Sequence, residues 1–192
     1  MKYRTLYADP PWNEMGGGKI VRGAQRHYPL MKTPDICNLQ VNGRHASALA
    51  EDNAHLYLWV TNNKLLDGLR VVEAWGFEYK TMITWAKDRF GLGQYYRGQT
   101  EHVIFAVRGV LPYRTRDGKR AQGRTLIDGF DAPRGEHSVK PEAMRKWIEE
   151  VSHDPYIELF ARKTSPGWSV WGNEVGTFDQ RQGSPHEDHP VP

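Results

Sequence analysis

Cysteine and long apolar runs are scarce in this chain of 192 residues, and both shortages exclude classes of protein. Cys37 is the single cysteine, so an internal disulfide and a zinc site built on several cysteines are excluded, which suits a reducing compartment. No apolar stretch reaches the roughly 18 residues of a membrane-spanning helix, and the first residues lack the apolar segment of a signal peptide. We therefore expect a cytoplasmic protein that does not enter a membrane.

Histidine motifs for metal binding are also absent. None of the eight histidines forms a pair of the HExxH type. His186 and His189 lie near the C-terminal end in a segment without periodicity, where a solvated tail explains them better than a metal does. We expect no metal site.

Positive charge is present in two clusters, although the net charge is only +3. One cluster lies in RTRDGKRAQGR (114–124) and the other in the glycine-rich segment EMGGGKIVRGAQRHY (14–28). Both clusters are candidates for contact with a polyanion, and solvated loops are the alternative explanation. The candidate residues are Lys19, Arg22, Arg26, Arg114, Arg116, Lys119, Arg120 and Arg124.

Short β-rich runs alternate with helical patterns along the chain. Strands are predicted at 5–8, 55–60, 80–85, 102–107 and 156–161, and apolar residues recur at helical spacing over 65–72 and 144–151. This alternation predicts an α/β fold, a three-layer α/β/α sandwich with a largely parallel sheet. We expect one domain over 1–175 and a disordered tail over 176–192, because the tail loses periodicity.

The sequence DPPW (9–12) directly follows the first predicted strand, where parallel sheets bind ligands. Pro10 and Pro11 fix two φ angles and remove two N–H donors, so the turn is stiff and its carbonyls lack a backbone donor within the motif. The Asp9 carboxylate and the Pro10 carbonyl would orient an amine, while Trp12 offers a flat face to a ring. Adenine is such a ligand, and a rigid turn with a surface tryptophan is the bland alternative.

Residues near the other end of the chain are also candidates for a ligand site. Lys140 precedes Pro141 at a predicted helix start, where a cation opposes the helix dipole unless an anion lies between them. Glu158 interrupts an apolar strand and needs a partner, for which Arg162 is the candidate. Asn173 and Glu174 follow a turn-rich segment and offer acceptors for hydroxyl groups. Solvation of Lys140, a structural Glu158–Arg162 ion pair and a capping role for Asn173 are the alternatives.

DPPW, HSVKP (137–141), IELFAR (157–162) and GWSVWGNE (167–174), in this order, resemble the adenine-N6 methyltransferases that include the catalytic subunit of the eukaryotic mRNA adenosine methyltransferase and small bacterial and phage enzymes. Segments 55–79, 85–87 and 97–109 are similar to that family as well, so the resemblance covers the chain up to Val175. It implies a Rossmann-like fold in permuted order, with the catalytic motif first and the elements for S-adenosylmethionine last.

The resemblance also implies roles for residues. Asp9, Pro10, Pro11 and Trp12 would be catalytic, and Lys140 would bind the carboxylate of the donor. The implied donor site comprises Asp9, Lys140, Glu158, Arg162, Asn173 and Glu174. Arg97 and Glu101 fall near positions that the family uses around the acceptor adenosine.

Two features depart from the family. Only eight residues precede DPPW, so the upstream contacts of family members to the adenine of the donor are absent or replaced. Thr164 and Ser165 stand where the mRNA enzyme has a histidine and an asparagine. We expect S-adenosylmethionine as cofactor and nucleic acid as partner, DNA rather than RNA. A non-catalytic, nucleic-acid-binding relative is the competing hypothesis, and self-association or a protein partner is left open.

Overall fold

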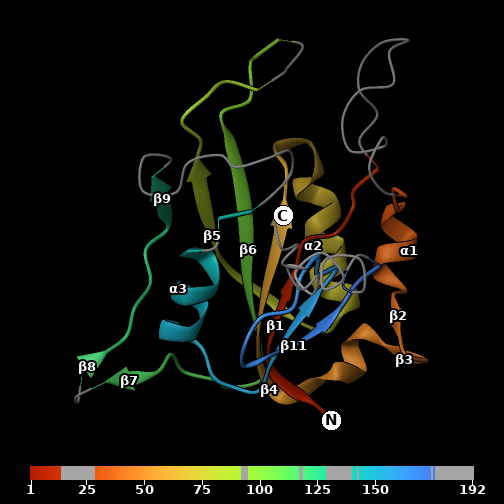
Figure 1. The fold of residues 1–192 in the computed structure, drawn as a ribbon, viewed down its shortest axis with the longest axis vertical. Coiled ribbons are helices and arrows are strands. Elements are labelled where there is room, and N and C mark those ends of the chain that lie inside the picture. The colour runs from red at the N-terminus through yellow and green to blue at the C-terminus, as the bar shows by residue number, and fades with distance from the viewer. Residues whose placement is uncertain are drawn as a thin grey trace, which may run out of the picture.

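One mixed sheet organises the chain in this computed structural model (Figure 1). The structure describes residues 1–13, 29–91, 95–116, 119–128, 140–141, 143–173 and 175. The elements are β1 (Tyr3–Ala8), α1 (Thr33–Cys37), β2 (Gln40–Val41), β3 (Arg44–His45), η2 (Ala46–Leu49), β4 (Ala50–Val60), η3 (Asn62–Lys64), α2 (Leu65–Ala74), β5 (Glu78–Ala86), β6 (Thr100–Arg108), β7 (Thr115–Arg116), β8 (Lys119–Arg120), β9 (Leu126–Asp128), α3 (Ala143–Val151), β10 (Tyr156–Leu159) and β11 (Trp168–Trp171).

The sheet has seven strands in the order β11-β10-β1-β4-β6-β5-β9. Neighbouring strands are parallel except at β6, which runs antiparallel to both β4 and β5. The largely parallel sheet is therefore confirmed, with one reversed central strand that the apolar pattern of 102–107 did not distinguish. The strands β10 and β1 end side by side, with Leu159 paired to Ala8, so the residues after both strands meet at one edge. We call this the catalytic edge.

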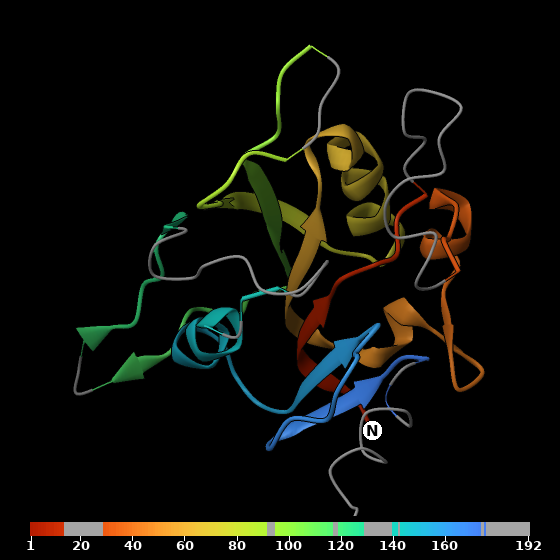
Figure 2. The same ribbon diagram turned by 45° about the horizontal axis from the view of Figure 1, so that its top comes forward.

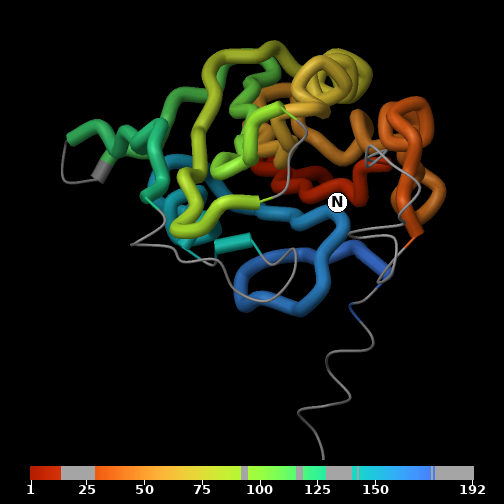
Figure 3. Tube along the Cα trace, turned by 90° about the horizontal axis from the view of Figure 1, so that it is seen from above, coloured from red at the N-terminus to blue at the C-terminus, as the bar shows by residue number. Residues whose placement is uncertain are grey.

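Alternation along the strands creates two cores, one on each face of the sheet. On one face Leu6, Leu56 and Leu58 pack with Val71 and Val72 of α2. On the other face lie Tyr7, Tyr57 and Trp59, together with Met144 and Ile148 of α3. Figure 3 shows α2 and α3 on opposite sides of the sheet. The three-layer α/β/α fold is confirmed.

Buried polar groups on the α3 face are hydrogen-bonded to one another. His55 is 1% exposed, and its Nδ1 lies 2.7 Å from Ser152 Oγ while its Nε2 lies 2.8 Å from the carbonyl oxygen of Leu111. The hydroxyl of Tyr57 lies 2.7 Å from the same Ser152 Oγ. A neutral imidazole that donates from Nε2 to Leu111 and accepts at Nδ1 satisfies this arrangement.

This histidine predicts a loss of stability in acid. Burial lowers the pKa of His55, whereas the unfolded chain takes up a proton near pH 6.5. Its contribution to stability is therefore present above about pH 6.5 and is lost as the pH falls through its folded pKa. We expect His55→Gln to be less stable at pH 7.5 but to lose less stability than the parent between pH 7.5 and 5.5, measured by urea unfolding. The half-buried His153 gives the control, His153→Gln, and equal slopes for parent and His55→Gln would contradict this account.

No described helix is long and apolar enough to cross a bilayer. The predicted tail, 176–192, lies outside the described residues.

Candidate active site

The DPPW turn leaves β1 at the catalytic edge and is fixed by backbone hydrogen bonds. The Asp9 N–H donates to the Leu159 carbonyl at 3.4 Å, and the Met31 N–H donates to the Pro11 carbonyl at 2.8 Å. The Trp12 N–H donates to the Pro10 carbonyl at 2.9 Å. The expectation that no donor within the motif answers these carbonyls is therefore wrong for Pro10, because Trp12, the first residue after the two prolines, has an N–H that reaches back to it. One lone pair of the Pro10 carbonyl remains for a ligand.

Trp12 is part of the core rather than a face for stacking. Its indole is 7% exposed, and its Nε1–H donates to the carbonyl of Trp59 at 2.9 Å. The predicted stacking of Trp12 on a base is contradicted by this burial. The indole instead anchors the turn to the end of β4, which holds Asp9 in place.

A chain of four charged side chains reaches the Asp9 carboxylate from the β5–β6 side. Lys140 Nζ lies 3.0 Å from Asp9 Oδ1 and 3.2 Å from Glu101 Oε2, and Lys87 bonds the other oxygen of Glu101. All four side chains are mostly buried. Since the charges alternate, the chain Lys87–Glu101–Lys140–Asp9 compensates two carboxylates with two ammonium groups. Within it, Lys140 is shared between both carboxylates.

Aromatic rings support the two cations of this chain. Lys140 Nζ lies 5.2 Å from the centre of the Trp59 ring, and Lys87 Nζ lies 5.1 Å from that of Trp85. The two indoles pack edge to face at 6.0 Å. Ring faces attract cations that have lost water, so this aromatic floor stabilises the ammonium groups.

The pKa values follow from burial and from this sharing. Burial alone would lower the pKa of Lys140, but the carboxylates of Asp9 and Glu101 outweigh it and raise that pKa. Burial alone would raise the pKa of Glu101, but the ammonium groups of Lys140 and Lys87 outweigh it and lower that pKa. For Asp9, burial prevails over Lys140 and, with the nearby Glu101, raises the pKa above the ordinary value. Burial and the charged chain together therefore shift the pKa values of the two carboxylates in opposite directions.

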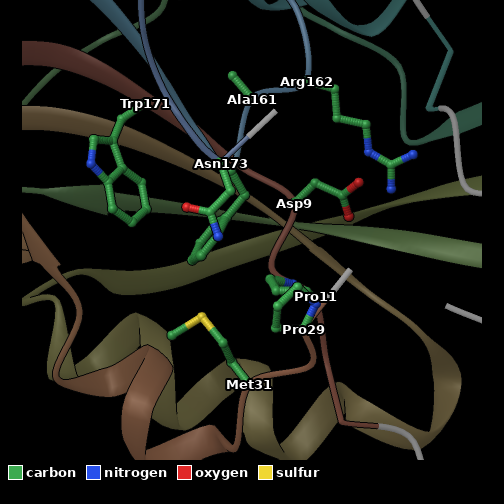
Figure 4. Close-up of a pocket in the computed structure, with 9 residues that line it drawn as sticks. Asp9, Pro11, Pro29, Met31, Ala161, Arg162, Trp171 and Asn173 are labelled. Atoms are coloured by element: carbon green, nitrogen blue, oxygen red, sulfur yellow. The ribbon is translucent and has the colours of Figure 1, made fainter. Parts of the chain in front are cut away.

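A cavity of about 120 Å³ adjoins Asp9 on the side of β10 and β11 (Figure 4). Its polar lining comes from Asp9, Arg162 and Asn173, and the remaining walls are mostly apolar. Figure 4 shows the Asn173 side chain between Trp171 and Asp9, with Met31 and Pro29 across the cavity. The full lining is Asp9, Pro11, Pro29, Met31, Phe160, Ala161, Arg162, Trp171 and Asn173.

Three of the predicted donor-site residues, Asp9, Arg162 and Asn173, thus line one cavity. Sequence reasoning missed five other residues that line it, namely Pro29, Met31, Phe160, Ala161 and Trp171. Phe160 and Trp171 pack edge to face at 5.7 Å. Glycine is required at 172, where a Cβ would lie 2.2 Å from the Ala161 carbonyl oxygen. The aromatic pair therefore forms because two chain segments come unusually close. The only sequence signal for these cavity residues was an apolar residue directly after a strand. That pattern is too common to indicate a binding site.

Glu158 has a different partner from the one expected. Arg145 of α3 binds its carboxylate through two nitrogens, Nε at 2.8 Å and Nη2 at 3.0 Å, and Glu158 is 7% exposed. The predicted pairing with Arg162 is wrong, because alternation turns Glu158 toward the α3 face while Arg162, beyond the strand end, lines the cavity. Glu158 does not line the cavity, so the structure gives it the role of joining α3 to the sheet.

This bidentate pair predicts a defined loss of stability. Arg145→Ala leaves a buried carboxylate without its two charged hydrogen bonds, so we expect the free energy of unfolding to fall by about 2 to 3 kcal/mol. Lys146→Ala on the exposed side of the same helix is the matched control, with an expected change within about 0.5 kcal/mol. Urea unfolding measures both variants, and equal midpoints for Arg145→Ala and the parent would show that the pair contributes nothing.

One residue of the basic cluster at 114–124 has structural partners. Arg114 Nη1 donates to the Glu149 carbonyl at 3.0 Å and lies 3.5 Å from the Tyr156 hydroxyl, and the contact of Arg114 with phosphate stays a prediction. Lys119 and Arg120 are exposed on β8, which Figure 1 shows at the opposite end of the sheet from the β5–β6 connection. Arg124 is exposed in the segment between β8 and β9.

Several candidates cannot be placed. Lys19, Arg22, Arg26 and Glu174, as well as the side chain of Arg116, lie outside the described residues. Arg97 is described and lies in the β5–β6 connection, where its Nε donates to the Gly91 carbonyl at 3.1 Å. No group of three or more histidine, cysteine, aspartate or glutamate side chains within the described ranges is arranged to hold a metal ion.

A comparison with known protein families places all of these elements within one family profile. The MT-A70 family profile matches residues 3–174, which span the turn, the charged chain and the cavity. The chain belongs to the MT-A70 family. The predicted resemblance is thereby confirmed.

Relatives of this MT-A70 chain include methyltransferases from distant organisms. It is 32% identical to the type II methyltransferase M.MunI of a Mycoplasma species. The alignment, 195 positions long with its gaps, covers 91% of this chain and 78% of the relative. It is 30% identical to the N6-methyladenosine RNA methyltransferase MTA1 of Cryphonectria parasitica and 29% identical to the N(6)-adenine-specific methyltransferase METTL4 of Homo sapiens. The matches cover 93% and 92% of this chain but only 53% and 38% of those two proteins.

Proposed function

We propose that this chain is an S-adenosylmethionine-dependent methyltransferase that methylates the exocyclic N6 amine of adenine in nucleic acid, with DNA favoured over RNA. The observation that carries the proposal is the position of Asp9. Its carboxylate lines the cavity on one side and accepts the Lys140 ammonium on the other. Two relatives named as N6-adenine or N6-methyladenosine methyltransferases support the same reaction.

The cavity residues fit S-adenosylmethionine in chemical type. When bound, this donor supplies a methyl group activated by a sulfonium. Arg162 and Asn173 offer donors and acceptors to its carboxylate and ribose, and Asp9 offers negative charge to its cationic groups. Phe160, Trp171 and Met31 offer apolar walls to its adenine.

Lys140 takes a different part in this proposal from the one expected. Its ammonium already binds Asp9 and Glu101, so we assign it to holding the catalytic carboxylate rather than the carboxylate of the donor. Arg162 is then the cation that lies in the cavity. Glu174 stays a candidate for the ribose.

Asp9 acts on the amine in this mechanism. The Asp9 carboxylate and the remaining lone pair of the Pro10 carbonyl each accept a hydrogen bond from one N–H of the adenine amine. These two hydrogen bonds orient the lone pair of the amine nitrogen toward the cavity. Methyl transfer would be direct, with no covalent enzyme intermediate: the C–S bond of the sulfonium would break as the N–C bond forms, and the proton that the methylated nitrogen loses would pass to the Asp9 carboxylate and on to solvent. The raised pKa of Asp9 strengthens its acceptor oxygen, which helps as the amine nitrogen becomes positively charged in the transition state.

The DNA preference is the finer part of the proposal. The compact domain resembles the small bacterial and phage enzymes. This chain covers 78% of the length of the type II methyltransferase M.MunI but only 53% of the length of the RNA methyltransferase MTA1. In DNA the amine is paired inside the duplex, so the target base must leave the stack to reach Asp9. A cytoplasmic location fits this role.

A methylation assay tests the proposal. The full chain is incubated with radiolabelled S-adenosylmethionine and either duplex DNA, single-stranded DNA or RNA, and the digested nucleosides are separated to identify the product. We expect label in N6-methyladenine from DNA, with less from RNA. Label mainly from RNA would overturn the DNA preference, and nucleic-acid binding without any transfer would support the non-catalytic relative.

A further inference from the structure

The connection between β5 and β6 is a built hairpin. Beyond the strand ends, the Lys87 N–H donates to the Gln99 carbonyl at 2.7 Å and the Gly91 N–H donates to the Gly98 carbonyl at 2.6 Å. A Cβ on Gly91 would lie 3.0 Å from the Gly98 oxygen, which explains glycine at this close approach. Figures 1 and 2 show the described parts of this connection projecting past the catalytic edge, away from the sheet.

The outer part of this hairpin exposes aromatic and basic side chains together. Tyr95 and Tyr96 are each 92% exposed, and Phe90 is 60% exposed. The Arg97 guanidinium lies 5.6 Å from the centre of the Phe90 ring, and the Arg89 side chain is 82% exposed. We call these five residues the β5–β6 tip. Large aromatics gathered on a surface mark an interaction site rather than ordinary surface composition.

The base of the hairpin is connected to the catalytic carboxylate. Lys87, its first residue, bonds Glu101 on the other strand, and Glu101 shares Lys140 with Asp9. On the β5 side, Arg89 and Phe90 of the tip lie two and three residues beyond Lys87, and on the β6 side the other tip residues lie four to six before Glu101. At about 3.3 Å per extended residue, the tip stands roughly 7 to 20 Å above the charged chain. That height matches a few nucleotides on either side of a base held at Asp9.

We propose that the β5–β6 tip binds the nucleic-acid strand beside the target adenine. Tyr95 and Tyr96 stack on neighbouring bases and replace part of the stacking lost when the target leaves the duplex, while Arg89 and Arg97 contact phosphates. Aromatic rings interleaved with arginines are the combination that binds unstacked bases and their backbone, because every base has a π face. This proposal rests on the proposed function, and it supplies the stacking groups that the buried Trp12 does not offer.

The central test compares variants of the two tyrosines. Tyr95→Ala/Tyr96→Ala removes both rings, Tyr95→Phe/Tyr96→Phe keeps them, and Tyr79→Ala removes an exposed tyrosine of β5 outside the tip. Fluorescence anisotropy measures the Kd for a random-sequence duplex and for its single strand. We expect the alanine pair to raise Kd about tenfold or more on both probes, and the other two variants to stay within about twofold.

The arginines are tested through salt dependence. Arg89→Ala/Arg97→Ala should reduce the slope of log K against log salt by about 2 on duplex DNA, because two phosphate contacts are lost. Arg70→Ala/Lys146→Ala removes the same charge from exposed positions on α2 and α3 and should leave the slope unchanged. Equal slopes for the tip variant and the parent would overturn the phosphate contacts.

The outcomes separate this proposal from the proposed function. A parent that binds both probes but transfers no methyl group defeats the proposed function, while the binding comparison still decides the role of the tip. An unchanged Kd for the alanine pair in an active enzyme defeats the tip alone. If sedimentation shows a parent dimer that the alanine pair dissociates, with Kd for nucleic acid unchanged, the tip is a protein interface and the proposal is wrong.

Discussion

Asp9→Ala should abolish methyl transfer, lowering the single-turnover rate at least about a thousandfold, while the affinity for S-adenosylmethionine falls less than about tenfold. The expected difference between the loss of rate and the loss of donor affinity follows from the position of Asp9. Asp9 is one of nine residues that line the cavity, so a bound donor loses a single contact. The adenine amine, by contrast, loses the charged acceptor that orients its lone pair, and that interaction is strongest in the transition state.

Asp9→Asn sharpens this prediction because it keeps the size of the side chain and one acceptor oxygen. We expect a rate nearly as low as for alanine, since the amide carries no charge and turns two N–H donors toward Lys140 or the amine. Asp52→Ala is the matched control, because its carboxylate is 97% exposed and pairs with Lys2 only at 3.9 Å. Single-turnover transfer of labelled methyl and calorimetric titration of donor measure the two quantities. Substantial turnover by either Asp9 variant would end the mechanism.

Local patterns in the sequence predicted the frame of this site. Alternating strands and helices placed DPPW after the first strand, and parallel strands put Ala8 and Leu159 at one edge. The family and the common donor site of Asp9, Arg162 and Asn173 came from the resemblance of whole motifs, whereas the three-layer fold and the position of DPPW follow from such local patterns. These predictions succeed because backbone geometry determines them within a few residues.

The interactions that set the chemistry could not be predicted in this way. Lys140 is separated from Asp9 by 131 positions in sequence, and no periodicity links the two residues. Arg145 reaches Glu158 because α3 packs on one particular face of β10, and strand alternation alone does not say which helix covers that face. The buried indole N–H of Trp12 needs an acceptor, and the carbonyl of Trp59, which lies in another segment of the chain, supplies it. Pairings of this kind are properties of the packed chain.

Lys140→Met should lower turnover at neutral pH by about a hundredfold and leave donor affinity nearly unchanged. Removing one partner of a buried ion pair costs about 3 kcal/mol or more, because the remaining charge stays buried. Here two carboxylates lose their shared ammonium, and Lys87 remains in contact with Glu101 but not with Asp9. Asp9 is then less able to ionise. If Lys140 instead bound the carboxylate of the donor, calorimetry would show donor affinity reduced about ten- to a hundredfold, with turnover little changed at saturating donor.

The pH profile gives this prediction a second readout that general loss of structure would not produce. Asp9 must be ionised to accept the amine, and burial already raises its pKa in the parent. Without Lys140 the pKa rises further, so the acid limb of the turnover profile should move to higher pH by about one unit or more, and raising the pH should recover activity. Lys140→Arg keeps the charge beside both carboxylates and should keep the limb near its original position. An acid limb that stays in place in Lys140→Met would show that Lys140 does not set the ionisation of Asp9.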